Sequence, residues 1–264
     1  MLNFRNTNIL FVLLVVGLIT WDLNHGVGWY FYLLLFVVYS LVLFWGSAKV
    51  TSNFYIKVLN SAADRLPGGV NTGKQIAISF DDGPSGKFTP GILDVLNAQQ
   101  VPTVFFCIGK NIAGNEVLLK RIVDEGHIIG NHSYSHHFWF DMYSSGKMTE
   151  DLATMNVETL RVTGLKPALF RPPYGVTNPN LAKAIRSGGF TPVGWNIRSM
   201  DTVVKEPEKL LANTLAAVKP GAIVLFHDTC EATFLMLPAF IDKVKNMGYE
   251  FVRPDKMLNV SPYA

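Results

Sequence analysis

Several side chains that can do acid–base or metal chemistry follow short apolar runs in this sequence. Each run has the length of one β-strand, and an acid, an imidazole or a guanidinium follows it within a few residues. The residues are Asp81 and Asp82 after 76–80, His132 and His136 after 127–130, Arg171 after 168–170, and His227 and Asp228 after 222–226. Asp201 adds a carboxylate six residues beyond Trp195. Together these groups are the side-chain types that hydrolysis assisted by a metal ion uses.

Each of these patterns also has an ordinary structural explanation when it stands alone. Paired aspartates before Gly-Pro, as at Asp81 and Asp82, are typical of a turn. His132 and His136 are four residues apart, which places two imidazoles on one face of a helical turn. Such a pair is more often structural than metal-binding. The metal hypothesis therefore depends on these groups coinciding at one face of one fold.

The elements that must position these residues alternate between strand-like and helix-like segments. Predicted strands cover 76–80, 103–108, 127–130, 168–171, 191–195, 222–226 and 249–252. Predicted helices cover 91–99, 116–125, 150–162, 179–187, 207–218 and 235–246. About seven β–α units in about 200 residues imply a parallel sheet covered by helices. We therefore predict an α/β fold, a distorted or incomplete (β/α) barrel of about seven strands, whose chemistry gathers at the carboxyl ends of the strands.

Residues with known preferences for helix ends mark several of these helices. Thr149 and Asn178 are predicted N-caps, and Pro179 then occupies the first helical position. Glycines stand where helix stops are expected, at Gly126, Gly164, Gly188 and Gly248.

The first 50 residues are much more apolar than the rest of the chain. Between Arg5 and Lys49 there is no lysine or arginine, and Asp22 is the single acid. Apolar runs occupy 9–21 and 29–45. As a helix the second run spans roughly 26 Å, close to the roughly 30 Å hydrocarbon core of a bilayer. We predict a transmembrane hairpin anchor at 1–50, although the short first run also resembles a signal peptide.

Positive charges flank the two apolar runs but are missing from the turn between them. Arg5 precedes the first run, and Lys49, Lys57 and Arg65 follow the second. The positive-inside rule then puts both ends, and the body of the chain, in the cytoplasm. If the first run does not span the bilayer, the body lies outside. We predict a location at the cytoplasmic (inner) membrane, with the side on which the body lies left open.

The rest of the chain has the composition of a soluble folded domain. The 264 residues are 49% hydrophobic and 16% charged, which excludes a mainly disordered protein. The net charge of +3 does not support a nucleic-acid partner. Two cysteines, Cys107 and Cys230, exclude a disulfide-rich scaffold. We predict a linker at 51–73 and a folded domain at 74–264.

Four motifs resemble, in order and spelling, those of the polysaccharide deacetylases, the NodB-homology group of carbohydrate esterase family 4. They are SFDDGP at 79–84, HSYSH at 132–136, RPPYG at 171–175 and LFHD at 225–228, and the resemblance covers roughly 74–254. A further motif is only partly kept. Trp195 and Asp201 match it, but Arg198 stands where an acid is common and Thr202 where tryptophan is common.

The resemblance implies a metal site with three protein ligands. Asp82, His132 and His136 would bind one divalent ion and leave a position open. Such a donor set suits catalytic zinc, with cobalt or manganese also compatible. His137 does not keep the spacing of four residues and is read as structural or supporting.

The resemblance also implies roles in removing an N-acetyl group. Asp81 would be the general base, paired with Arg171, which would orient it and keep its pKa low. His227, tuned by Asp201, would protonate the leaving amine. The backbone N–H of Tyr174 would help the metal to stabilise the oxyanion.

The expected substrate is an N-acetylated polysaccharide or a glycan of the peptidoglycan type. Its acetyl methyl group would lie in a pocket formed by Leu225, Trp195 and Pro173, although plain core packing also explains the first two. Two alternatives stay open. One is a deacylase or deformylase acting on a polyprenyl-linked amino sugar at the bilayer, and the other is a non-catalytic glycan-binding module.

Overall fold

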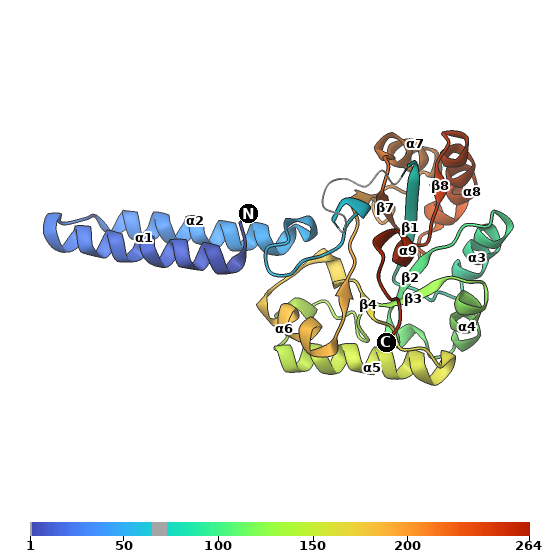
Figure 1. Cartoon of the computed structure of the whole chain (residues 1–264), viewed down its shortest axis with the longest axis horizontal. Coiled ribbons are helices and arrows are strands. Elements are labelled where there is room, and N and C mark those ends of the chain that lie inside the picture. The colour runs from blue at the N-terminus through green and yellow to red at the C-terminus, as the bar shows by residue number, and fades with distance from the viewer. Residues whose placement is uncertain (1, 65–72) are drawn as a thin grey trace.

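The computed structural model describes residues 2–64 and 73–264 and has two parts, an apolar helical hairpin and an α/β domain (Figure 1). The hairpin projects from one side of the domain, the side on which helix α6 lies. The C-terminus ends against the domain.

A curled parallel sheet forms the centre of the domain. Its strand order is β5-β4-β3-β2-β1-β7-β6, and β8 pairs with β1 outside this path. The strands are β1 Gln75–Asp81, β2 Val104–Cys107, β3 Ile128–Asn131, β4 Leu169–Phe170, β5 Thr191–Pro192, β6 Ile197–Arg198, β7 Ala222–His227 and β8 Glu250–Phe251. Because β5 and β6 end the path without pairing with each other, the sheet is a half-barrel. This confirms the predicted distorted or incomplete (β/α) barrel.

Helices cover the sheet, and side chains on both of its faces are buried. The helices are α3 Thr89–Ala98, α4 Glu116–Asp124, α5 Ser145–Thr163, α6 Pro179–Gly188, α7 Pro207–Ala217, α8 Glu231–Asn246 and α9 Pro254–Leu258. The central strand β1 shows why both faces are apolar: Ile78 and Phe80 pack in one core cluster, and Ala77 packs in another on the opposite face. A parallel strand that is buried on both faces appears in the sequence as a continuous apolar run.

Helix α5 begins earlier than the sequence predicts. Its N-cap is Ser144, whose side chain accepts a hydrogen bond from the Lys147 N–H, so the predicted N-cap Thr149 is wrong. Thr149 lies inside the helix, where its hydroxyl donates to the Ser145 carbonyl oxygen. Gly146, a poor helix former, lies in the first turn and obscured this start in the sequence pattern.

The ends of α6 agree more closely with the prediction. Asn178 is its N-cap and accepts a hydrogen bond from the Leu181 N–H, with Pro179 at the first helical position. The helix runs through Gly188, and the left-handed C-cap is Gly189, one residue later than predicted.

Strand β6, which pairs with β7, was not predicted because two residues show no periodicity.

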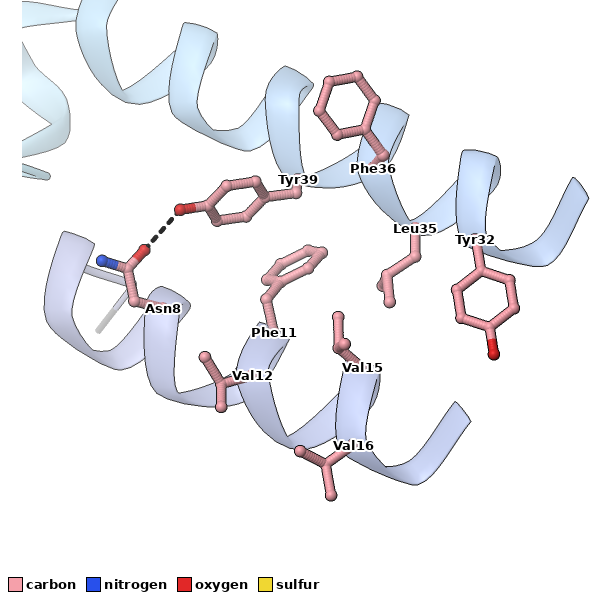
Figure 2. A pocket seen from close by; sticks show the side chains of 9 residues that line it. All are labelled: Asn8, Phe11, Val12, Val15, Val16, Tyr32, Leu35, Phe36 and Tyr39. Atoms are coloured by element: carbon pink, nitrogen blue, oxygen red, sulfur yellow. Dashed lines mark hydrogen bonds between the residues drawn. The ribbon is translucent and has the colours of Figure 1, made fainter. Parts of the chain in front are cut away.

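The two N-terminal helices, α1 Phe4–His25 and α2 Trp29–Ala48, are long and apolar enough to cross a membrane by length and composition. Hydrogen bonds join them near both ends, from Tyr39 to Asn8 and from Tyr32 to Asp22. Figure 2 shows Tyr39 reaching across to Asn8 beside a groove of about 520 Å³. The groove walls are mainly aliphatic and aromatic, so the groove accommodates apolar groups.

The base of the hairpin packs directly on the domain. The Thr177 N–H donates to the Ser47 carbonyl oxygen at the end of α2, and the Phe4 N–H donates to the Phe54 carbonyl oxygen. Gly46 is needed for this approach, because a Cβ there would lie 2.4 Å from the Phe54 ring. The hairpin is therefore seated against the domain through backbone contacts at both of its ends.

The segment predicted as a linker, 51–73, packs against the domain as far as Asp64. Val58 is fully buried and Leu59 forms an isolated parallel bridge with Val193. Residues 65–72 lie outside the described residues, and so does Arg65, one of the charges used to predict orientation.

His127, at the opposite end of β3 from the candidate site residues, lies in a buried environment. Burial, together with the charges of Arg121 and Arg253, lowers its pKa from 6.5 to about 4. The folded state therefore binds this proton less readily than the unfolded state does. Stability contributed by neutral His127 is complete above pH 6.5 and is lost as the pH falls from 6.5 towards 4.

We expect His127→Leu to reduce acid sensitivity in that pH range, because leucine has no proton to take up. One pKa unit corresponds to about 1.4 kcal/mol. The difference in free energy of unfolding between the variant and the wild type should therefore change by on the order of 3 kcal/mol between pH 7 and pH 4. Urea unfolding of the full chain in detergent, at several pH values, measures it. Parallel stability curves for the two proteins would contradict the expectation.

Candidate active site

The carboxyl ends of β1, β3, β4 and β7 bring the chemically active residues together. The register pairs Asp81 at the end of β1 with His227 at the end of β7. On the other side of β1 the sheet continues through β2 to β3, which ends at Asn131, directly before His132. Because all these strands are parallel, their ends meet at one edge of the half-barrel.

Asp82, His132 and His136 form a cluster suited to one metal ion. The Asp82 Oδ1 atom lies 3.5 Å from His132 Nε2 and 3.6 Å from His136 Nε2, too far for hydrogen bonds. Ligands at about 2.0–2.1 Å from a tetrahedral zinc ion are themselves about 3.4 Å apart. The His132 Nδ1–H donates to the Arg171 carbonyl oxygen at 2.9 Å, which leaves Nε2 as the lone-pair donor. The donor atoms and their spacing fit a divalent cation.

The loop that carries the two histidines is held by side chains around it. Asn131 Oδ1 accepts a hydrogen bond from the Ser133 N–H, and Ser133 Oγ accepts one from the His136 N–H. From α5, Asp151 accepts hydrogen bonds from the N–H groups of Tyr134 and Ser135. These contacts fix the direction of the loop.

Unusual backbone angles gather at this edge of the sheet. Asp82, Ser133, His136 and Tyr174 all have positive φ angles, which L-residues other than glycine adopt at a cost. A further constraint is Gly83, because a Cβ there would lie 2.0 Å from the Asp228 carboxylate. This explains physically why glycine follows the paired aspartates.

Asp81 is buried and is held by a buried arginine. Arg171 donates to Asp81 Oδ1 at 2.7 Å and to Ser79 Oγ at 2.8 Å, and its guanidinium lies 4.1 Å from the centre of the Phe106 ring. The other carboxylate oxygen, Asp81 Oδ2, lies 3.8 Å from His132 Nε2. One oxygen is therefore anchored while the other faces the metal-ligand cluster.

The pKa of Asp81 differs from the sequence-based expectation. Burial raises the pKa of Asp81 above its ordinary value, and the charge of Arg171 lowers it only in part. The expectation that Arg171 keeps this pKa low is therefore wrong for the net shift, because the desolvation of a fully buried carboxylate outweighs one ion pair. A raised pKa makes the carboxylate a better proton acceptor near neutral pH.

His227 and Asp201 form a second pair, in which the carboxylate is fully buried and the imidazole is half-buried. The His227 Nδ1–H donates to Asp201 Oδ1 at 2.7 Å, while Asp201 Oδ2 accepts hydrogen bonds from the His227 N–H and the Thr233 hydroxyl. Burial lowers the pKa of His227, but the hydrogen bond and charge of Asp201 outweigh it and raise the pKa to about 9. His227 Nε2 points toward the cluster, 4.0 Å from Asp82 Oδ2. This imidazole can therefore carry a proton at neutral pH.

A pocket of about 200 Å³ joins these groups. Leu225, Trp195 and Tyr174 line it, as the sequence-based assignment requires. Pro172 lines it in place of the predicted Pro173, which is buried behind the wall. Asp201 and Arg171 are fully buried behind the residues that they support.

Besides Pro172 and Gly175 of the RPPYG motif, two pocket residues were not assigned a role from the sequence. Arg198 and Thr202 both line the pocket and are exposed. Their only signal in the sequence was that they depart from the motif typical of the resembling family. Arg198 brings a positive charge to the rim of the pocket.

The sequence model of the family described as polysaccharide deacetylase matches residues 68–193. A Listeria monocytogenes protein named peptidoglycan-N-acetylglucosamine deacetylase is 35% identical over 190 residues, which cover 70% of this chain and 39% of that protein. The chain thus spans well under half the length of this relative.

Two further comparisons cover most of the related molecule. A Bacillus subtilis protein named peptidoglycan-N-acetylmuramic acid deacetylase is 31% identical, with 76% of this chain and 79% of that protein covered. A crystal structure of a peptidoglycan N-acetylglucosamine deacetylase superposes with a TM-score of 0.70 at 30% identity, covering 74% of this chain and 93% of that one.

Proposed function

The chain belongs to the polysaccharide deacetylase family, and from this we propose that it is a metal-dependent hydrolase that removes N-acetyl groups from amino-sugar residues of a glycan. The relatives named as peptidoglycan deacetylases support a polymeric or peptidoglycan-type substrate. One observation carries the proposal. Asp81 and His227 flank the Asp82, His132 and His136 cluster within a single pocket.

In this proposal Asp82, His132 and His136 hold one divalent ion, with zinc favoured by the donor set. The chemistry that such an ion supplies is Lewis acidity toward a carbonyl group and a lowered pKa of water. All remaining roles belong to side chains and backbone groups of the chain itself.

Proton transfer is assigned to Asp81 and His227. Asp81 takes a proton from the attacking water through the oxygen that Arg171 leaves free. His227 gives its proton to the nitrogen of the leaving amine, since Asp201 keeps that imidazole charged and oriented. The two groups thus act at opposite ends of the same bond cleavage.

The pocket wall positions the acyl group. The backbone N–H of Tyr174 is assigned to the oxygen of the acyl carbonyl, where negative charge develops during attack. Leu225 and Trp195 offer apolar surface for the acetyl methyl group. A formyl group lacks that methyl and would leave this surface without a contact.

We also propose that the hairpin anchors the chain in a membrane. Its two helices have the length and hydropathy for this role. The proximity of hairpin and pocket favours a second candidate function, the deacylation or deformylation of a lipid-linked amino sugar. Thr177, which binds the end of α2, follows Tyr174 of the pocket wall by three residues, and exposed Phe138 and Trp139 lie on the neighbouring loop.

The test is an assay of the full-length chain in detergent after loading with zinc. We expect acetate release from N-acetylglucosamine oligomers or peptidoglycan fragments. The same protein treated with a chelator, and then reloaded with zinc, is the control, and its activity should disappear and return. The full chain is required because Val58, before the predicted domain boundary, belongs to the core.

The outcomes separate the two candidate functions. Release of acetate or formate only from a lipid-linked sugar would favour the second one. No release from any substrate by a protein that retains zinc would contradict hydrolysis and favour a glycan-binding module.

A further inference from the structure

Four cations line one pocket at the foot of the hairpin. Arg5 comes from the first turn of α1, Lys57 from the segment that follows the hairpin, and Lys183 and Arg186 from α6. The pocket has a volume of about 470 Å³, and none of the residues that line it is aspartate or glutamate. In Figure 1, α6 lies on the side of the domain from which the hairpin leaves. Tertiary structure thus gathers four positive charges from three separate segments.

These four side chains are exposed, and none pairs with a carboxylate of residues 2–64 or 73–264. Four other arginines of the domain do have such partners, namely Arg121, Arg161, Arg171 and Arg253, whereas Arg198 has none among the described residues. Like charges that share a concave surface repel one another, and an anion relieves this repulsion. The electrostatics of the pocket therefore favour a bound anion.

Two helix ends and three amides strengthen this preference. The pocket includes Pro179, the first residue of α6, and Asn3, the N-cap of α1, so the positive ends of both helix dipoles point toward it. Asn6 and Asn53 add polar groups to the wall. The side-chain NH₂ groups of these asparagines can donate to the oxygens of a phosphate group, and the helix ends contribute through their dipoles.

The position of the pocket relates the anion to the bilayer, and this step rests on the membrane anchoring proposed above. Helix α1 has 22 residues and therefore a length of about 33 Å, close to the hydrocarbon thickness of a membrane. Arg5 lies at the end of α1 that contacts the domain, through the bond between Phe4 and Phe54. This end of the helix lies at the level of the lipid headgroups. Phe4 and Tyr55 give the same pocket an apolar wall.

We propose that this pocket binds the phosphate of an anionic phospholipid, with the apolar part of the lipid against Phe4 and Tyr55. Basic pockets beside membrane-spanning helices bind lipid headgroups by the same physics. The bound lipid would fix the angle between the domain and the membrane surface. Since α6 follows the RPPYG loop closely in the chain, that angle also fixes how the catalytic pocket faces the membrane.

The experiment compares lipid retention by the full-length chain in detergent. Native mass spectrometry, with added phosphatidylglycerol or phosphatidylcholine, measures the apparent affinity for each lipid. We expect wild type to prefer phosphatidylglycerol, and the double variant Lys183→Gln/Arg186→Gln to bind it on the order of tenfold more weakly, because each cation near a membrane surface contributes to the attraction. The double variant Lys209→Gln/Lys243→Gln removes the same charge from exposed positions on α7 and α8 and should behave like wild type.

A second pair, Arg5→Gln/Lys57→Gln, removes the pocket cations that lie outside α6 and gives an independent test if the α6 variant does not fold. Equal retention of the two lipids by wild type would overturn the proposal, and so would equal losses in the α6 and control variants. If inorganic phosphate bound with the same apparent affinity as phosphatidylglycerol, the lipid would be ruled out as the source of the bound phosphate group.

Activity on soluble N-acetylglucosamine oligomers separates this inference from the proposed function. The α6 variant should keep wild-type activity, since neither residue lines the catalytic pocket. An inactive wild type that still prefers phosphatidylglycerol would leave the lipid site standing and contradict the deacetylase. A wild type that is active but shows no lipid preference would support the deacetylase and contradict the lipid site.

Discussion

Asp81→Asn is expected to lower kcat by roughly 10²–10⁴-fold while the protein still binds zinc, because asparagine cannot take a proton from water. The substitution is nearly isosteric, and the amide oxygen can still accept the hydrogen bond from Arg171 that now goes to Asp81 Oδ1. Asp81 is absent from the Asp82, His132 and His136 donor cluster. Steady-state kinetics on the substrate found for wild type, together with zinc content measured by mass spectrometry, checks both halves of the expectation.

The loss of one buried negative charge should also weaken folding. Arg171 is fully buried, and removing the partner of a buried ion pair costs about 3–5 kcal/mol. Kinetics should therefore be measured at a temperature where the variant is shown to be folded. A low rate in a folded, zinc-loaded protein then reports the lost base.

Asp228→Asn is the matched control for Asp81→Asn. Asp228 is also a buried carboxylate, but it binds the Thr89 hydroxyl and does not line the pocket. Burial raises its pKa to about 7, so its replacement removes less charge. Near-normal turnover in Asp81→Asn would refute the base assignment, and equal losses in both variants would trace the effect to local packing.

His132→Ala is the second substitution with a large expected effect, and it should remove metal and activity together. His132 supplies one of three donor atoms, and its ring is oriented by the hydrogen bond to the Arg171 carbonyl oxygen. Changes to groups that merely support a ligand already cost about 10–100-fold in affinity or activity. Losing the ligand itself should lower zinc affinity by more than about 100-fold, measurable by competition with a chelator of known affinity.

The adjacent histidine of the same loop provides the control. His137 is exposed, accepts a hydrogen bond from the Trp139 N–H and stacks against Tyr143, and it does not belong to the donor cluster. His137→Ala should therefore keep both zinc and turnover. If His132→Ala bound zinc as tightly as wild type, the proposed ligand set would have to be abandoned.

Local patterns in the sequence carried much of the fold prediction. The β1 strand and the N-cap Asn178 depend on neighbouring residues, and both occur where the pattern places them. Elements without a local signal were missed. Strand β6 has two residues and exists through pairing with β7, and the start of α5 depends on a cap at Ser144 that a glycine obscured.

In the candidate site, too, features that depend on nearby residues were predicted and features that depend on the whole domain were not. His132 and His136 belong to one short motif, so their spacing alone places them together. The net pKa shift of Asp81 could not be predicted, because it results from burial by the whole domain acting against one arginine. Pro172 takes the place of Pro173 in the pocket wall because backbone direction, which the spelling of the motif does not specify, decides which of two neighbouring prolines faces inward.

By itself the sequence determined the alternation of strands and helices, the apolar hairpin segments and the order of the motifs, since periodicity, capping and motif spelling are properties of nearby residues. Tertiary structure decided which atoms meet. Arg171 reaches Asp81 across 90 positions, and Asp201 reaches His227 across 26. Arg5 and Arg186 share a pocket although one belongs to α1 and the other to α6. The resemblance of the motifs anticipated the first two contacts, but strand register and helix docking, which arise from packing of the whole domain, bring their atoms together. The shared pocket of Arg5 and Arg186 has no local trace in the sequence.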